Sequence, residues 1–172
     1  MAVTDFFFAL GVPVACELDR SQLDAHYRQR QAQWHPDRFV TASETEKLQA
    51  LRHTSLLNDA YSTLKEPLRR AEHLLQLKDS DAATYPAPRL EPAFLLQQLE
   101  LREELEQLGS RRDAVALAAL EVMRQAVESQ WTAHWHEFTA ETARQDWCNA
   151  RLSLQKLQFL HKLQEEIRHL EE

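Results

Sequence analysis

"QWHPDRF", residues 33–39, places a proline between a histidine and an aspartate in a chain that has only six prolines. Pro36 fixes its own φ, lacks an N–H donor and biases His35 away from the α-helical region, so a preceding helix must end at about Trp34. The side chains of His35 and Asp37 then project from a rigid corner. The tripeptide alone is consistent with a plain helix-ending turn or with a corner that a partner protein contacts.

Amphipathic runs on both sides of this corner predict a helical hairpin. Before the corner, Leu23, Tyr27 and Trp34 recur at helical spacing, and Asp19 is the candidate N-cap. After it, residues 43–65 carry a second set of apolar side chains at helical steps: Leu48, Leu51, Leu56, Ala60 and Leu64. Two antiparallel helices joined by the corner are therefore expected.

The composition predicts an all-α protein. Leu, Ala, Gln, Glu and Arg dominate, and glycine occurs only twice, so the chain favours helix and offers few turns. The net charge is −7, with the acidic excess mainly after residue 77, which argues against non-specific binding of nucleic acid. Cys16 and Cys148 are single and far apart, so neither a disulfide framework nor a zinc site is indicated.

The sequence shows no sign of membrane insertion or export. No apolar run approaches the roughly 18 residues that a transmembrane helix needs. The first residues lack both the basic start of a secretory signal and the Arg- and Ser-rich character of a transit peptide. We therefore expect a cytoplasmic protein that contacts no membrane.

A proline-rich segment divides the chain into two domains. Residues 78–90 have no helical period, and three prolines fall within seven residues around the end of this segment, which is typical of a semi-stiff linker. Before it lies an N-terminal domain over residues 1–77, which contains the hairpin. After it we expect a three-helix bundle over residues 91–172, with helices at about 91–108, 111–138 and 142–171.

The sequence around the corner resembles a J domain, the module that stimulates the ATPase of DnaK-class chaperones. "LLNDAYSTLKEPLRR", residues 56–70, is similar to the IN-x-AY-x-x-L-x-x-P-x-x-R ending of J domains. The matching positions, in order, are Asn58, Ala60, Tyr61, Leu64, Pro67 and Arg70. This resemblance implies that the chaperone contacts are His35, Pro36 and Asp37, with Arg28, Arg30 and Arg38 as electrostatic support.

The second half resembles the HscB family of J-type co-chaperones in iron–sulfur cluster assembly. "FLLQQLELREELEQL", residues 94–108, is similar to the opening of that family's C-terminal bundle, and "LQKLQFLHKLQEEI", residues 154–167, to a second stretch. The resemblance implies two partners, an HscA-like chaperone of the DnaK class and an IscU-like scaffold protein. It also implies that the scaffold contacts are Leu95, Leu96, Leu99, Glu100, Glu103 and Phe159.

The helical periodicity of residues 94–108 is an independent reason to expect a binding surface there. One face carries a normal core stripe of Phe94, Leu101, Leu105 and Leu108. A different arc, roughly opposite, carries Leu95, Leu96 and Leu99. A peripheral helix of a three-helix bundle needs only one apolar face, so the second arc is either covered by the N-terminal domain or open to a partner.

No catalytic constellation is recognisable in the sequence. Glu166 and His169 form one E-x-x-H pair, whereas a di-iron site in a helical bundle needs two such pairs. No HExxH motif and no nucleophile elbow are present. We therefore expect a protein that is not an enzyme and that binds no cofactor or metal. The alternative function is a general J-protein that delivers unfolded polypeptides to a DnaK-class chaperone.

Overall fold

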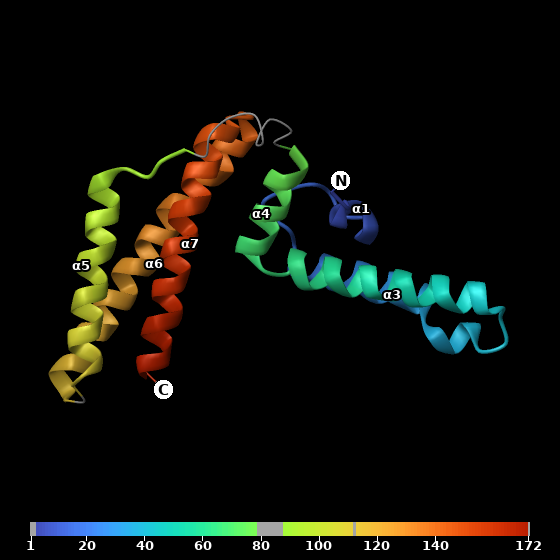
Figure 1. The fold of residues 1–172 in the computed structure, drawn as a ribbon, viewed down its shortest axis with the longest axis horizontal. Coiled ribbons are helices and arrows are strands. Elements are labelled where there is room, and N and C mark those ends of the chain that lie inside the picture. Colours follow the sequence, from blue (N-terminus) through green and yellow to red (C-terminus); the bar gives the residue numbers. More distant parts are fainter. Residues whose placement is uncertain (1–2, 79–87, 112, 172) are drawn as a thin grey trace. The chain divides into compact units, whose positions relative to one another are not determined.

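The computed structural model describes residues 3–78, 88–111 and 113–171, and every regular element in them is helical (Figure 1). The predicted all-α fold class is confirmed. The chain divides into two compact units, Met1–Asp81 and Ala82–Glu172. Most of the predicted linker lies outside the described residues, so the domain boundaries stay predictions. Within the described part of the chain, none of the helices has both the length and the apolar composition needed to span a bilayer.

The helical hairpin of the first unit is formed by α2 (Arg20–Trp34) and α3 (Glu44–Leu64). The Asp19 side chain caps α2, as its position in the sequence predicts. Ser43 is the N-cap of α3 and forms a capping box with Glu46. The Ser43 hydroxyl accepts the Glu46 backbone N–H, and the Glu46 carboxylate accepts the Ser43 backbone N–H. Helix α2 ends at Trp34, where the proline two residues later requires it to end.

The core of the first unit is built on one face of α3, against which α1 (Phe6–Leu10), α2 and α4 (Pro67–Lys78) all pack. The buried apolar side chains from α1, α2 and α3 are Phe7, Leu10, Leu23, Ala50, Leu57, Ala60 and Leu64. Leu48 and Leu51, which we expected in this stripe, are 48% and 60% exposed, so that part of the prediction is wrong. The buried stripe includes Ala50 instead. Its small side chain lets neighbouring helices approach closely, but alanine is only weakly hydrophobic, so the apolar pattern of the sequence does not mark it as a core residue.

Arg70 is a structural residue of the first unit. It is only 7% exposed, and its guanidinium donates from Nε to the Cys16 carbonyl and from Nη1 to the Leu64 carbonyl, both at 2.7 Å. The first bond fixes the segment between α1 and α2. The second satisfies a carbonyl at the end of α3 that has no partner within the helix. The arginine that completes the J-domain pattern thus ties three segments together.

A buried histidine on α4 holds α1 in place. The Phe6 N–H donates to Nε2 of His73 at 3.1 Å, and the rings of Phe6 and Phe7 stack on the imidazole at centroid distances of 4.5 and 5.7 Å. Burial lowers the pKa of His73, and the opposing effects of Asp5 and of a hydrogen bond with Gln76 are smaller. Because an accepting Nε2 must be unprotonated, the neutral imidazole is the form that holds α1.

The first unit is therefore expected to lose stability as the pH falls below about 6.5, the usual pKa of histidine. The unfolded chain takes up a proton at that pH, whereas the lowered pKa of His73 delays uptake in the folded protein, so acid favours unfolding. Thermal melts at about pH 7.5 and about pH 5.5 measure this effect. Wild type should lose more melting temperature than His73→Gln, which keeps an acceptor but does not titrate. Equal losses in the two proteins would contradict this role.

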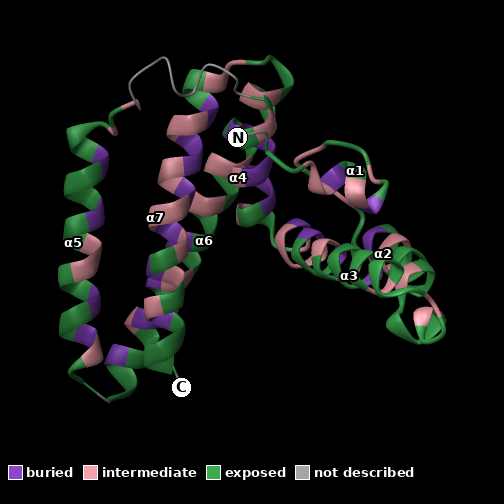
Figure 2. Ribbon diagram, turned by 45° about the vertical axis from the view of Figure 1, so that its right-hand side comes forward, coloured by how far each residue is buried: buried purple, intermediate pink, exposed green. Residues whose placement is uncertain are grey.

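The second unit is a three-helix bundle of α5 (Pro92–Gly109), α6 (Ala114–Ala143) and α7 (Trp147–Glu171). Figure 2 shows buried positions recurring along all three helices. One core cluster draws on each of them: Leu105, Leu108, Ala116, Leu120, Met123, Val127, Leu160, Leu163 and Ile167. The predicted bundle is confirmed.

The predicted helix boundaries in this unit are partly wrong. Helix α6 continues past Phe138 to Ala143, because no glycine or proline interrupts the residues in between. The turn is made instead by Gln145, with a φ of 59° that a non-glycine residue rarely adopts. At the other end, Asp113 caps α6, so the helix begins at Ala114 and not at about residue 111 as predicted.

Candidate functional site

The HPD tripeptide forms an exposed turn between α2 and α3. His35 follows α2 in an extended conformation, and Pro36 begins η1 (Pro36–Phe39), a 3-10 turn that the sequence did not predict. The Asp37 N–H donates to Nδ1 of His35 at 3.3 Å, and the Asp37 carboxylate lies 3.6 Å from the same nitrogen. The two side chains are 53% and 86% exposed. An imidazole and a carboxylate are thus presented together to solvent.

Aromatic packing supports this turn. The indole of Trp34 stacks on the ring of Phe39 after the turn and on the ring of His53 from α3. The Thr54 hydroxyl donates to the Trp34 carbonyl at 3.1 Å, and the Arg38 guanidinium donates to the Ala32 carbonyl at 3.1 Å. The corner is therefore attached to both helices of the hairpin. Sequence reasoning missed the part played by His53 and Thr54.

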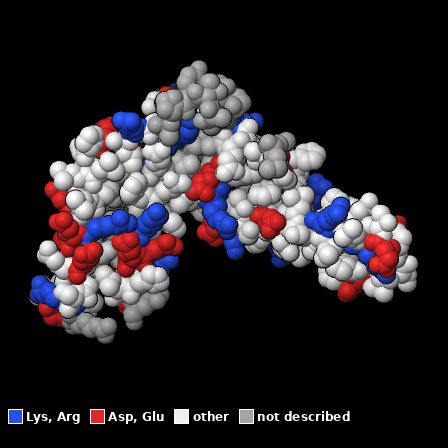
Figure 3. Space-filling view, viewed as in Figure 1, with Lys and Arg blue, Asp and Glu red and all other residues white. Residues whose placement is uncertain are grey.

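The three predicted basic side chains, Arg28, Arg30 and Arg38, are all exposed. Nε of Arg28 donates to the Asp24 carbonyl at 3.3 Å. Nη2 of Arg30 lies 2.8 Å from where a side chain on Gly11 would begin, and Gly11 itself has a φ of +70°. Arg38 follows Asp37 in the turn and donates to the Ala32 carbonyl of α2, whereas the contacts of Arg28 and Arg30 lie toward Asp24 and Gly11. Figure 3 shows positive charge mixed with acidic side chains on the visible faces of the units.

The second apolar arc of α5 is exposed in the second unit. Leu95, Leu96 and Leu99 are 43%, 56% and 54% exposed. The carboxylates of Glu100 and Glu103 are exposed on the same helix. The three leucines are therefore not buried by the other helices of their bundle. Together with the two carboxylates they form a surface with an apolar centre and an acidic border.

Two side chains of α7, those of Phe159 and Lys156, contact Phe94 on the core face of α5. The Phe94 ring meets the ring of Phe159 edge to face at 6.2 Å, and Nζ of Lys156 lies 5.8 Å from the Phe94 centroid. Phe159 is half-buried by this contact. The structure thus brings Phe159 together with the start of α5, and it adds Lys156, which sequence reasoning missed because its partner lies on another helix.

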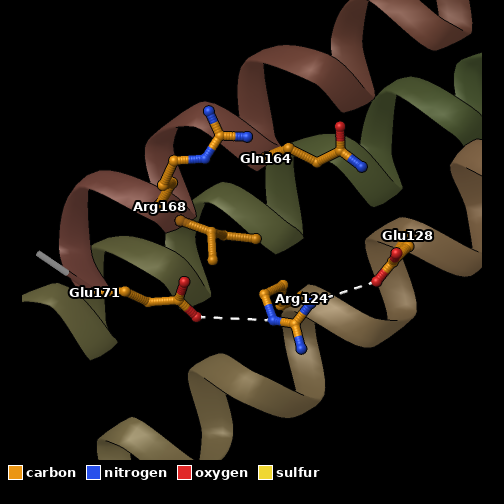
Figure 4. Close-up of a pocket in the computed structure, with 6 residues that line it drawn as sticks. Arg124, Glu128, Gln164, Arg168 and Glu171 are labelled. Atoms are coloured by element: carbon orange, nitrogen blue, oxygen red, sulfur yellow. Dashed lines mark hydrogen bonds and ion pairs between the residues drawn. The ribbon is translucent and has the colours of Figure 1, made fainter. Parts of the chain in front are cut away.

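A groove of about 250 Å³ lies between α6 and α7 (Figure 4). Arg124 bonds Glu121 at 2.7 Å and lies 3.4 Å from Glu128 and 3.9 Å from Glu171 of α7. The Glu121 carboxylate raises the pKa of Arg124, so the cation is secure at neutral pH. The charged side chains that line this groove therefore form an ion-pair network, which links α6 to α7. Among the described residues, no group of three or more His, Cys, Asp or Glu side chains is arranged to hold a metal ion.

Comparison with known proteins identifies the family. Residues 90–168 match the family model described as the HSCB C-terminal oligomerisation domain. A co-chaperone protein HscB from Proteus mirabilis is 40% identical over 168 residues, covering 98% of this chain and 96% of the relative. An HscB homolog from Vibrio cholerae is 37% identical over 169 residues, covering 98% and 97%.

Solved structures agree over both units. The chaperone HscB from Vibrio cholerae superposes with a TM-score of 0.83 at 37% identity, covering 98% of each chain. The human co-chaperone protein HscB superposes with a TM-score of 0.82 at 25% identity, covering 98% of this chain and 83% of the human one. The family model, the sequence relatives and the solved structures together show that this chain belongs to the HscB family of co-chaperones.

Proposed function

We propose that this protein stimulates the ATPase of an HscA-like, DnaK-class chaperone and delivers an IscU-like scaffold protein to it, which aids the maturation of iron–sulfur proteins in the cytoplasm. The proposal divides the chain into a J domain over residues 1–77, a linker over residues 78–90 and a client-binding bundle over residues 91–172. Its main support is that one chain of the HscB family presents two exposed surfaces, an HPD corner and an uncovered apolar arc on α5.

The proposed chaperone contact consists of His35, Pro36 and Asp37, with Arg28, Arg30 and Arg38 beside them. The corner carries out no chemistry of its own. It accelerates hydrolysis because it binds the hydrolysis-competent state of the chaperone better than the resting state, which shifts the population of states. The exposed arginines attract an acidic partner surface and raise the rate of association more than the final affinity.

The proposed scaffold contact has Leu95, Leu96 and Leu99 at its centre. Glu100, Glu103 and the half-buried Phe159 complete it. Apolar side chains at the centre of an interface supply most of the binding free energy once water is excluded from them. The surrounding carboxylates select a partner that offers positive charge at the border of the contact.

The decisive experiment is the steady-state ATPase rate of an HscA-like chaperone, measured alone, with this protein, with an IscU-like scaffold and with both. We expect stimulation by this protein alone and a larger effect with both than the sum of the two separate effects. Absence of stimulation would reject the proposal. If the protein instead suppresses aggregation of unrelated unfolded proteins and the scaffold adds nothing, the general J-protein function is the correct one.

A further inference from the structure

The last residue of α2 is held by two successive residues of α3. The ring of His53 stacks on the indole of Trp34 with a centroid distance of 3.9 Å and an interplanar angle of 18°. The hydroxyl of Thr54 donates to the Trp34 carbonyl at 3.1 Å. Because Trp34 immediately precedes His35, these two contacts determine how the chain enters the HPD corner.

The chain also leaves the corner against the same indole. Phe39, the last residue of η1, stacks on Trp34 with a centroid distance of 6.0 Å and an interplanar angle of 5°. The residues between Trp34 and Phe39 include the whole HPD tripeptide. A displacement of the indole would consequently move both ends of the corner.

The two contacts from α3 do not constrain Trp34 equally. The Thr54 hydroxyl has a single proton, and it lies 2.9 Å from the Ala50 carbonyl of its own helix as well as near the Trp34 carbonyl. Its bond to Trp34 is therefore shared, and it restrains only the backbone. The His53 ring covers the indole itself. Because His53 is otherwise exposed, its ring adds little to the core of the unit.

We infer that His53 is a positioning residue, whose ring holds the Trp34 indole so that the HPD corner is ordered before the chaperone binds. This inference rests on the proposed function, because it assumes that the corner is the surface that stimulates the chaperone. Without the stack, only a fraction of molecules presents the binding-competent corner. The apparent Kd then rises by the inverse of that fraction, while the complex, once formed, is unchanged.

The test is a titration of chaperone ATPase stimulation with His53→Ala, His53→Leu and His53→Phe. Loss of one stacked ring pair predicts that the concentration for half-maximal stimulation rises about three- to tenfold for the Ala and Leu variants, with the same saturating rate. His53→Phe should restore the wild-type value, because phenylalanine keeps a planar ring on Trp34. Gln49→Ala, an exposed change on the same helix, is the matched control and should behave as wild type.

Two further measurements make the outcome unambiguous. Thermal melts should place all variants within about 2 °C of wild type, since His53 is exposed. Full activity of His35→Gln in the same titration would reject the proposed function itself. If His35→Gln is inactive but His53→Ala and His53→Leu match wild type, the positioning role is overturned and the proposed function stands. The same conclusion follows if His53→Phe does not restore the wild-type concentration for half-maximal stimulation. A lower saturating rate at an unchanged half-point would also overturn it.

Discussion

His35→Gln is expected to abolish stimulation of the chaperone ATPase while the protein keeps its fold. The His35 side chain is 53% exposed, and its Nδ1 accepts the Asp37 N–H at 3.3 Å and lies 3.6 Å from the Asp37 carboxylate. A glutamine amide oxygen can accept the same N–H, so the turn should survive. The imidazole that we propose as the chaperone contact is lost, and we expect stimulation to fall at least about tenfold, equivalent to about 1.4 kcal/mol. Steady-state ATPase assays with saturating protein measure the effect.

His136→Gln is the matched control for this variant. His136 is an exposed histidine on α6 in the other unit, and the same chemical change there should leave stimulation and melting temperature unaltered. His35→Gln itself should melt within about 2 °C of wild type, because exposed residues outside the core contribute little to folding. A parallel loss of stimulation and of thermal stability would show that His35 is structural.

The corner was predictable from sequence because its cause is local. Pro36 alone requires α2 to end near Trp34, whatever the rest of the chain does. The hairpin followed from periodicity, since α2 and α3 are long enough to show a clear helical repeat. Short-range chemistry therefore defined both the position of the HPD tripeptide and the exposure of its ionisable side chains.

The support beneath the corner was not predictable, because it depends on the register between α2 and α3. His53 lies far along the chain from Trp34, and nothing local indicates that the two rings stack. The same problem affected the apolar stripe of α3. Leu48 and Leu51 recur at helical spacing as well as the true core residues do, and only the packing of neighbouring helices shows that they face solvent.

The face of α5 that enters the core was predicted correctly except for one polar residue. Phe94, Leu105 and Leu108 are buried as expected, and Leu101 is half-buried. Gln98 is 7% exposed on the same face, and its amide nitrogen has no hydrogen-bond partner among the described residues. A glutamine gives no apolar signal, so sequence periodicity could not place it in the core. The opposite arc, which carries the candidate scaffold contact, was visible because three leucines fall outside the core stripe.

Truncation of Leu95, Leu96 and Leu99 to alanine is expected to weaken scaffold binding by about two powers of ten. These side chains are 43%, 56% and 54% exposed, so roughly half of each remains to be buried by a partner, worth about 1 kcal/mol each. Alanine is a good helix former, and the buried residues of α5 are untouched, so the bundle should remain folded. Calorimetric titration of the scaffold into the variant measures the loss of affinity.

The matched control is the triple alanine variant of Val115, Leu117 and Val122, which are 69%, 55% and 67% exposed on α6 of the same unit. It removes a comparable apolar surface and should bind the scaffold as wild type does.

In the α5 variant, stimulation of the chaperone by this protein alone should persist, because the HPD corner is unchanged, and only the additional stimulation by the scaffold should disappear. If the α5 leucines instead pack against the J domain, the variant would lose melting temperature and still bind the scaffold normally. Unchanged binding would therefore reject the assignment of this surface to the scaffold.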